Sequence, residues 1–172
     1  MRVRQVYMKA VQTAEFTLAI VLCCAAASPA QNRRLPPEIR TDLTRHAGRW
    51  RFVGNLDSAG QRCRDVLAAD LNGDGRRDYA VYILAGKGTA ERRQRLLVYL
   101  RTEAGYARRT FASAAASELY CLHLFRPGAR DYNYETQKHF RYQHATVGVF
   151  SEKGGSSYVY WRGRFYRITT SD

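Results

Sequence analysis

The sequence lacks the short motifs that define the commonest catalytic sites. It has no Gly-x-Ser-x-Gly nucleophile elbow, no His-Glu-x-x-His, no Cys-x-x-Cys pair and no glycine-rich phosphate loop. It has no apolar run of the roughly 20 residues that a transmembrane helix requires. It also shows no internal repeat with a period of roughly 20 to 50 residues. These absences disfavour a motif-defined enzyme, a permanent membrane span and a repeat architecture, and they favour a single non-enzymatic domain.

Acidic residues are scarce relative to basic ones. The chain has 15 Asp and Glu against 28 Lys and Arg, which gives a formal net charge of +13. The basic excess is nearly all arginine, a bias that genome composition alone can produce. A charge of this size motivates one alternative function, a binding module for polyanions such as nucleic acid, acidic polysaccharide or anionic lipid.

The first 30 residues have the three parts of a secretory signal. A basic lead is followed by an apolar run over 16–27 and by small residues that end at Ala30. We expect cleavage after Ala30, a linker over 31–35 and one domain over 36–172, exported to the periplasm or the extracellular space without an integral membrane anchor. Removing residues 1–30 leaves 25 basic and 14 acidic side chains, a formal charge of +11.

Only two cysteines follow the predicted signal, Cys63 and Cys121. An exported chain meets an oxidising compartment, where such a pair forms a disulfide, and the alternative is two separate buried thiols. Cys121 and His123 also share one face of a predicted strand. A catalytic dyad would need an orienting third group as well, and the sequence identifies none.

The stretch from Asp70 to Asp78 carries the clearest chemical pattern. Oxygen-bearing side chains occupy its first, third, fifth and ninth positions, with glycines at the fourth and sixth. Such a loop can curl so that its carboxylates, an amide and a main-chain carbonyl converge on one hard cation, for which calcium is the natural guest. The alternative is a tight Asn-Gly and Asp-Gly turn without an ion.

This loop, with the strand that follows it to Val81, resembles the calcium loop of FG-GAP and VCBS-type repeats. The resemblance implies that calcium binds to four side chains and one main-chain carbonyl, those of Asp70, Asn72, Asp74 and Asp78 and that of Arg76. An EF-hand would instead place a bidentate Glu at the position of Val81. The chain has one copy of the loop and is too short for a propeller. The order of its features resembles that of small exported bacterial proteins with a single such loop, which implies no known activity.

We predict an α+β fold in which a short N-terminal helix packs on one curved, mainly antiparallel sheet. The helix begins at Pro36 and Pro37, carries Ile39 and Leu43 at helical spacing, and ends at Gly48 in a left-handed cap. Period-two patterns predict seven or eight short strands, over 50–53, 66–69, 79–84, 96–100, 119–125, 146–150, 157–161 and 164–168. A small helix is predicted over 112–118, and the segment 127–144 is either a long excursion or two edge strands.

The last two predicted strands flank the two-residue turn Arg162-Gly163, which indicates a hairpin. We expect Val159, Trp161 and Phe165 to face the core. The other face would then form an aromatic and cationic surface suited to weak polyanion or glycan contact, made by Tyr158, Tyr160, Arg164 and Tyr166. The alternative is an ordinary solvated sheet face.

Three functions remain open from the sequence. The first is an exported, non-enzymatic domain that a structural calcium ion organises and that displays a surface to an envelope or extracellular partner. The second is the polyanion-binding module. The third is a metal-dependent hydrolase, but His139 and His144 would lie on opposite faces of a regular strand. Its remaining candidate residues are His123, Glu118 and Glu135.

Overall fold

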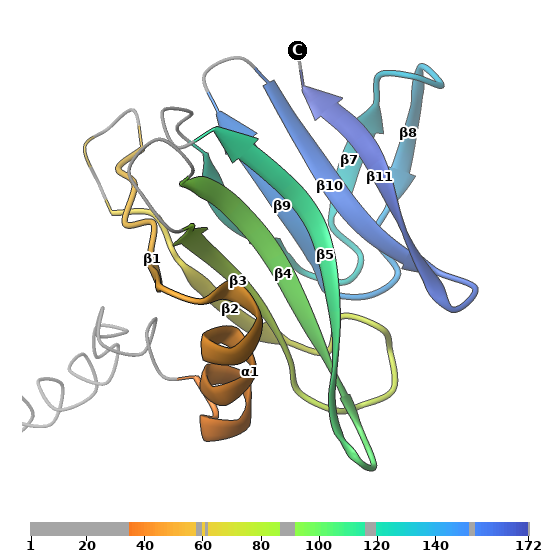
Figure 1. Cartoon of the computed structure of the whole chain (residues 1–172). Helices are drawn as coiled ribbons and strands as arrows, with labels where there is room; N and C mark the ends of the chain where they lie inside the picture. The colour runs from red at the N-terminus through yellow and green to blue at the C-terminus, as the bar shows by residue number, and fades with distance from the viewer. Residues whose placement is uncertain are drawn as a thin grey trace, which may run out of the picture. The chain divides into compact units, whose positions relative to one another are not determined.

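The structure is a computed structural model that describes residues 35–57, 60, 62–86, 92–115, 120–151 and 154–171. The predicted signal segment, the linker up to residue 34, and Glu118 lie outside the described residues. The helix is Pro37–Ala47 (α1) (Figure 1). The strands are Trp50–Phe52 (β1), Val66–Ala69 (β2), Asp78–Ala85 (β3), Arg93–Thr102 (β4), Gly105–Ala115 (β5), Cys121–Phe125 (β6), Arg130–Asn133 (β7), Lys138–Arg141 (β8), Thr146–Ser151 (β9), Gly154–Trp161 (β10) and Arg164–Ser171 (β11).

The described strands form three antiparallel sheets. Sheet 1 has the order β1-β3-β4-β5, with β2 also paired to β3, and sheet 2 has the order β11-β10-β9-β6. Strands β7 and β8 pair only with each other among the described strands. The predicted α+β class is therefore wrong: the described chain is mostly β, and its strands divide among several sheets rather than forming one curved sheet with a helix on it.

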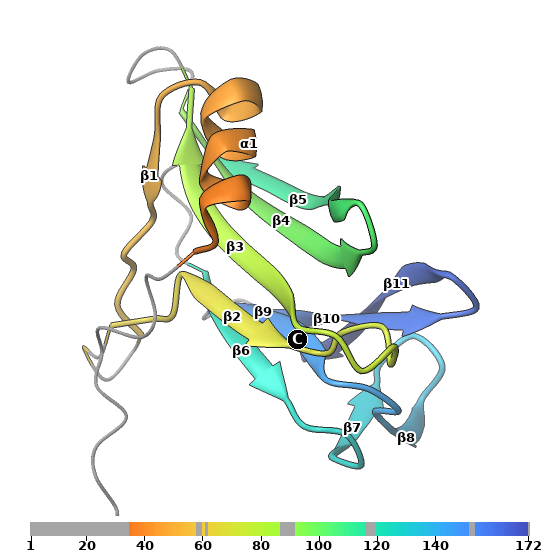
Figure 2. The ribbon, with the colours of Figure 1, turned by 90° about the horizontal axis from the view of Figure 1, so that it is seen from below.

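The main core lies between the two large sheets (Figure 2). Sheet 1 contributes mainly Tyr82, Leu96 and Val98, and sheet 2 contributes mainly Leu122, Val147 and Val149, all buried. Burial of apolar side chains of this size contributes roughly 1.5 to 3 kcal/mol each. The packing of one sheet on the other is thus the main source of stability in the fold.

A second core lies on the other face of sheet 1, beneath α1. Ile39 and Leu43 are completely buried against Val81, Ile83 and Leu97 of β3 and β4. Both faces of these two strands are therefore covered, one by the helix and one by sheet 2. This explains why β3 reads as a nearly continuous apolar run instead of alternating between apolar and polar residues.

Polar contacts fix α1 on sheet 1. Asp42 accepts hydrogen bonds from Tyr99 Oη at 2.9 Å and from an Arg108 guanidinium nitrogen at 3.1 Å. The predicted helix is confirmed, with Pro37 in its first turn. Gly48 has the positive φ of 65° expected at its end, but its ψ of −125° differs from that of the predicted left-handed cap.

Strand β5 was not predicted. Its residues Ala112–Ala115 were assigned to a small helix, whereas they pair with β4 in the structure. The register shifts between Leu96 and Leu97 of β4. Ala112 and Thr110 therefore each pair with a residue of β4, while Phe111 between them has no cross-strand partner. This bulge directs Phe111 toward sheet 2, where it stacks on Tyr158 with ring centroids 5.0 Å apart.

The predicted C-terminal hairpin is confirmed, because β10 and β11 pair around Arg162-Gly163, whose φ angles are 48° and 83°. The predicted faces are wrong for Trp161 and Tyr158, whereas Phe165 packs against the core and Arg164 and Tyr166 are exposed, as predicted. A two-residue turn pairs Trp161 with Arg164 and Tyr160 with Phe165, so Trp161 and Phe165 lie on opposite faces. Tyr158 is in the core at 9% exposure, while Trp161 is 44% exposed.

The segment 127–144 forms two strands, one of the two alternatives that the sequence left open. The β7–β8 hairpin is attached to sheet 2 by Tyr142, whose ring stacks on Phe125 and whose hydroxyl hydrogen-bonds Ser157 and Asp131. The backbone amide of Tyr134 also donates to the carbonyl of Thr169 in β11.

Candidate metal centre

The acidic loop joins β2 to β3 and curls around the carboxylate of Asp70. Asp70 accepts hydrogen bonds from the backbone amides of Gly73 at 2.7 Å, Asp74 at 3.1 Å and Gly75 at 2.8 Å. Gly73 and Gly75 have φ angles of 79° and 78°, which other residues adopt only with strain. These two glycines therefore allow the chain to turn its amides inward toward Asp70.

Asn72 and Asp74 form the exposed rim of the loop. The Asn72 amide nitrogen donates to one oxygen of Asp74 at 3.0 Å, and the Arg76 backbone amide donates to the other at 2.8 Å. The hydrogen bond from Asn72 has the larger effect and that from Arg76 the smaller, and both lower the pKa of Asp74 below its usual range. The Arg76 guanidinium lies 3.8 Å from Glu103.

Asp78 has different surroundings, because its side chain is completely buried at the start of β3. One oxygen accepts the Leu71 backbone amide at 2.9 Å, and the other accepts the Arg101 backbone amide at 2.7 Å. Burial raises the pKa of Asp78, the two amides lower it, and the charges of Asp74 and Asp70 raise it further. Asp78 thus attaches the loop to β4, and its negative charge is unfavourable there.

The loop also contacts His144, a candidate metal ligand of the hydrolase hypothesis. His144 lies so close to Gly73 that a Cβ atom on Gly73 would meet the imidazole ring at 2.3 Å. Leu71, in the core at 1% exposure, holds the loop from the other side. No local sequence signal could have linked His144 to Gly73, because the contact depends on how the chain before β9 packs.

The donor set fits a hard cation in its chemistry. Asp70, Asn72 and Asp74 present oxygen atoms within one curled loop. A carboxylate has about four lone-pair sites. Asp70 uses three of them for backbone amides and Asp74 uses two for hydrogen bonds, so both keep capacity for an ion. Among the residues that the structure describes, no three His, Cys, Asp or Glu side chains are grouped as a metal site. Calcium binding by Asp70, Asn72, Asp74, Arg76 and Asp78 therefore remains a proposal.

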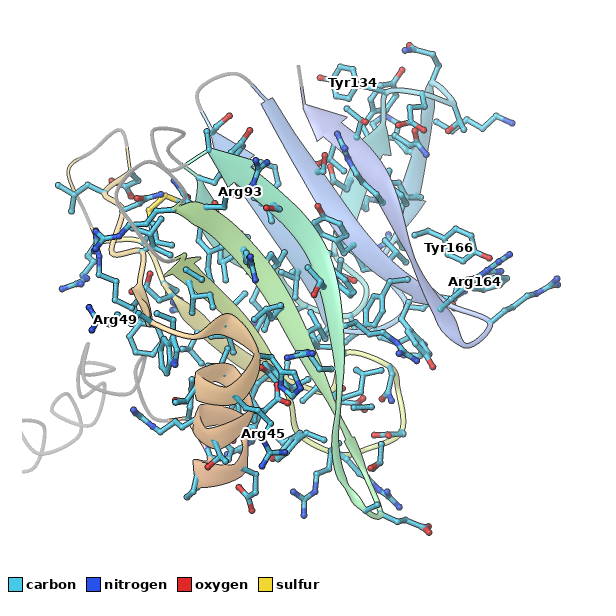
Figure 3. The ribbon with its side chains drawn as sticks, in the orientation of Figure 1. Arg45, Arg49, Arg93, Tyr134, Arg164 and Tyr166 are labelled. Carbon is cyan, nitrogen blue, oxygen red and sulfur yellow. A yellow bond between two sulfur atoms is a disulfide. The ribbon has the colours of Figure 1, made fainter. Side chains whose placement is uncertain are left out.

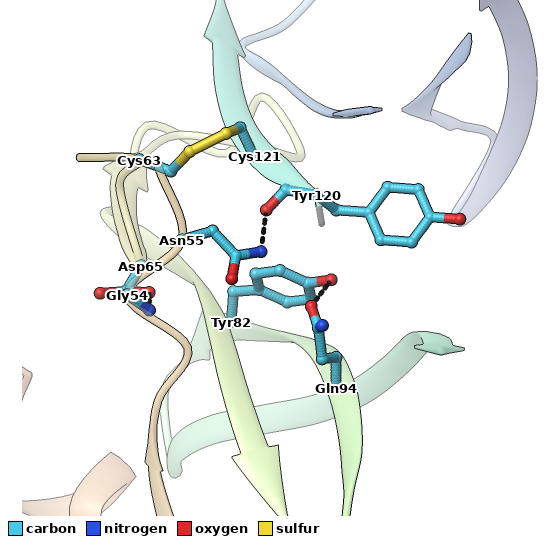
Figure 4. Close-up of a disulfide and its surroundings, with 8 residues drawn as sticks. All are labelled: Gly54, Asn55, Cys63, Asp65, Tyr82, Gln94, Tyr120 and Cys121. Atoms are coloured by element: carbon cyan, nitrogen blue, oxygen red, sulfur yellow. Dashed lines mark hydrogen bonds between the residues drawn. A yellow bond between two sulfur atoms is a disulfide. The ribbon is translucent and has the colours of Figure 1, made fainter. Parts of the chain in front are cut away.

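The structure joins Cys63 to Cys121 in a disulfide, with their Cα atoms 5.2 Å apart (Figure 4). An isolated bridge between Arg64 and Leu122 adjoins it, so the segment before β2 is attached to β6 at this point. The Asn55 amide nitrogen donates to the Tyr120 carbonyl at 2.7 Å. Since Cys121 is bonded, it supplies no thiol for a dyad with His123.

The histidines of the hydrolase hypothesis lie in separate surroundings. His123 packs beside Phe125 and Phe150, with the Phe125 ring centroid 4.9 Å away. His139 packs beside Tyr132, and His144 lies on the acidic loop. Glu135 accepts a hydrogen bond from the Thr169 hydroxyl. The structure does not bring these side chains together as one metal-binding group.

Aromatic and basic side chains do gather on the exposed face of the C-terminal hairpin (Figure 3). Arg164 lies over the ring of Tyr166 at 4.9 Å and Arg162 lies 5.5 Å from the ring centre of Trp161. Trp161 and Tyr166 are 44% and 37% exposed. This hairpin face, defined by Trp161, Arg162, Arg164 and Tyr166, keeps Arg164 and Tyr166 of the predicted set, and Trp161 and Arg162 stand in place of Tyr158 and Tyr160.

Over the residues that the structure describes, these features define a mostly β domain of two stacked antiparallel sheets, the β7–β8 hairpin and one helix, with an acidic loop at the start of an interior strand. Comparison of the chain with models of known protein families, with curated proteins and with solved structures finds no match. None of the helical residues that the structure describes forms a segment long and apolar enough to cross a bilayer.

Proposed function

We propose that this protein is an exported, non-enzymatic domain in which a calcium ion stabilises the loop over 70–78, and that it presents a surface to an envelope or extracellular partner. The observation that carries the proposal is the convergence of side-chain oxygens in the loop, where Asp70 and Asn72 both accept the Asp74 backbone amide. Burial raises the pKa of Asp78, and the charges of Asp74 and Asp70 raise it further, so a bound cation would offset unfavourable negative charge.

The position of the loop gives the ion a structural role. Asp78 connects the loop to β4 through the Arg101 amide, and Leu71 extends from the loop into the core between the sheets. A cation that orders Asp70, Asn72 and Asp74 would therefore also order the start of β3. An oxygen-saturated calcium site leaves little open coordination for chemistry, which agrees with a non-enzymatic role.

A calcium titration tests the proposal. We expect one calcium ion to bind with a dissociation constant of about 10⁻⁵ to 10⁻³ M. At 100 times that constant, binding would add about 2.7 kcal/mol to the free energy of unfolding. Calorimetric titration and thermal denaturation, each with calcium or with chelator, measure these two quantities.

Three variants separate an ion site from a simple turn. Asp74→Ala should abolish calcium binding and remove the calcium-dependent part of the stability. Glu103→Ala, outside the loop, should leave both unchanged. Asp78→Ala should destabilise the protein by about 2 to 4 kcal/mol even with chelator, because it leaves two backbone amides without an acceptor. If wild type and Asp74→Ala melt together under both conditions, the loop is a turn without an ion.

A second candidate function is weak binding of polyanions by the hairpin face. It is favoured by the exposed Trp161 and Tyr166 with their neighbouring guanidinium groups, since aromatic rings and arginines together can stack on sugars or bases and attract phosphate or sulfate. The formal charge of +11 that remains after residues 1–30 are removed would attract polyanions at long range.

Binding of heparin and of a single-stranded oligonucleotide at two salt concentrations tests this second function. We expect affinity to fall steeply as salt rises, because bound phosphates or sulfates release counterions. The double variant Arg164→Ala, Tyr166→Ala should weaken binding by about tenfold or more. The matched control is Arg45→Ala, Arg49→Ala, at and just after α1. Absence of binding at low salt, or equal loss in both double variants, would exclude the hairpin face as the site.

A further inference from the structure

The two large sheets do not fill the space between them completely. A cleft of about 540 Å³ opens between β4 and β5 on one side and β9, β10 and β11 on the other. A volume of this size accommodates a small organic molecule. The cleft is lined by Tyr82, Arg93, Gln94, Ala112, Ser113, Ala114, Ala115, Tyr120, Val149, Ser151, Gly154, Gly155, Ser156, Tyr158, Arg167 and Thr169.

Small side chains create the cleft. Stacked sheets lie about 10 Å apart, and large side chains normally fill the gap. Phe111 fills it at one point, with its ring centroid 5.0 Å from that of Tyr158 and 4.5 Å from that of Phe165. Beyond Phe111, β5 contributes Ala112 and Ala114, and β10 begins with glycines and a serine. These residues are too small to span the gap, so a space remains beside the aromatic stack.

Two bulges border this space. In sheet 1, the register shift between Leu96 and Leu97 places Phe111 at the inner end of the cleft. In sheet 2, β10 and β11 shift register between Gly155 and Ser156, which both line the cleft. Bulges interrupt the regular pleat and re-aim neighbouring side chains, and they occur often next to binding and active sites.

The polar groups of the cleft favour a negatively charged ligand. Arg167 shares a face of sheet 2 with Tyr158, its partner in the β-ladder, and donates from Nε to the Ser156 hydroxyl at 3.0 Å. Arg93, on the opposite sheet, donates from Nε to the Ser113 hydroxyl at 2.9 Å. The alternation that turns Gln94 toward sheet 2 turns Arg93 and Ser113 away from it, so Arg167 is the cation of the cleft. Its guanidinium has five N–H donors, so the bond to Ser156 orients it while leaving donors for a ligand. None of the described lining residues is acidic.

The remaining walls are suited to the body of such a ligand. Tyr82 donates to the Gln94 amide oxygen at 2.6 Å on the sheet 1 side, and both side chains are buried (Figure 4). Tyr158, Tyr120 and Val149 supply aromatic and aliphatic surface. Burial raises the pKa of the Tyr158 hydroxyl and the charge of Arg167 lowers it, which agrees with their proximity. Glu135 bonds to Thr169 but does not itself line the cleft.

We propose that the cleft between the two sheets binds a small organic anion, with Arg167 holding its carboxylate or phosphate group and the tyrosines of the cleft contacting its apolar or aromatic body. A guanidinium recognises either anionic group through paired N–H donors. This site is independent of the proposed calcium ion, because no residue of the loop over 70–78 lines the cleft.

Binding of phenyl phosphate and of benzoate to the full protein, followed by amide NMR, tests the proposal. The two anions share a ring and differ in head group, and benzyl alcohol is the neutral control. We expect saturable shifts of the amides of Ser156, Tyr158 and Gln94 with at least one anion, and none with benzyl alcohol. The anion that binds more tightly identifies the preferred head group.

Three variants locate the binding. Arg167→Gln should weaken it by about tenfold or more, because a charge-assisted pair is lost. Arg45→Gln, on α1 and outside the cleft, should leave it unchanged. Ala114→Phe should fill the cleft and abolish binding of both anions, with folding checked by thermal denaturation. The proposal is overturned if neither anion shifts these amides, if benzyl alcohol binds as well, or if Arg167→Gln and Arg45→Gln bind alike.

Discussion

At the scale of single residues, Gly73 and Gly75 have almost the same backbone but different neighbours. Their φ angles are 79° and 78°, while a Cβ would meet the ring of His144 at Gly73 and no atom within 4 Å at Gly75. We expect Gly75→Ala to destabilise the protein by about 1 to 2 kcal/mol through backbone strain alone. Gly73→Ala should cost more, because the imidazole must also move. Denaturant unfolding of both variants gives the difference.

A third variant identifies the source of that difference. His144→Ala in the Gly73→Ala background should remove the steric clash but leave the strain, so the double variant should recover stability toward that of Gly75→Ala. If Gly73→Ala and Gly75→Ala unfold at the same denaturant concentration, His144 does not restrict the loop. The measurement is made with chelator present, so that no bound ion contributes to the comparison.

The sequence indicated which loop residues carry oxygen donors, because donor type and spacing are local properties. It did not indicate that Asp78 accepts the amide of Arg101, nor that His144 covers Gly73. Both contacts join residues far apart in the chain. The spacing of the oxygen donors thus predicted that the loop residues form one site. It did not predict that Asp78 chiefly attaches the loop to β4.

At the scale of elements, the disulfide is a covalent cross-link between the segment before β2 and sheet 2. Cys63 precedes β2 of sheet 1, Cys121 begins β6 of sheet 2, and their sequence separation is 58. Closing a loop of that length removes entropy from the unfolded chain, worth about 4 kcal/mol. Reduction, or the double variant Cys63→Ser, Cys121→Ser, should therefore lower the midpoint of thermal unfolding by about 10 °C.

The two ways of removing the bond serve as controls for each other. Reduced wild type and the double variant should melt together if the loss comes from loop closure. Adding reductant to the double variant should change nothing. An unchanged midpoint after verified reduction would show that packing alone joins the two sheets.

Local signals explain which elements were predicted correctly. The C-terminal hairpin was found because Arg162-Gly163 specifies its turn, and α1 was found because its prolines and apolar spacing agree. Strand β5 was missed for two reasons. Its alanines favour a helix, and its bulge at Phe111 breaks the period-two pattern that predicts a strand. The single predicted sheet was wrong because the covered faces of β3 and β4 carry no signal of what covers them.

The same limitation applies to the hairpin faces. A two-residue turn places Trp161 opposite Arg164, so these two side chains lie on the same face of the hairpin, and the orientation of β10 determines that of β11. The prediction assigned Trp161 to the core face together with Val159 and Phe165. The structure instead buries Tyr158, because Phe111 extends from sheet 1 to meet its ring. The cleft beside that stack could not be predicted, since it depends on the distance between two sheets.

At the scale of the whole molecule, buried tyrosine hydroxyls occur in two different layers. Tyr99 donates to Asp42 between sheet 1 and α1, and Tyr142 donates to Asp131 between sheet 2 and the β7–β8 hairpin. Burial raises the pKa of both hydroxyls above the usual 10.0, and the bond to a carboxylate raises it further. Ionisation of either group would thus disrupt a contact between layers.

These shifts predict a loss of stability at alkaline pH. Above about pH 10 the unfolded chain releases these two protons while the folded chain retains them. The unfolded state then binds fewer protons, so the free energy of unfolding falls as pH rises. The contribution is fully present below pH 10 and decreases by about 1 kcal/mol per pH unit for each tyrosine. Urea unfolding at intervals from pH 8 to about pH 11 measures the slope.

Phenylalanine variants assign that slope to the two layers. Tyr99→Phe and Tyr142→Phe should each lose about 1 kcal/mol at pH 8, where a hydrogen bond is removed, and each should reduce the alkaline slope by one proton. Because the two residues are far apart and share no partner, the double variant should show the sum of both reductions. If wild type shows no slope between pH 9 and 11, these hydroxyls do not link stability to pH. If there is a slope and both variants keep it, the alkaline loss comes from other groups.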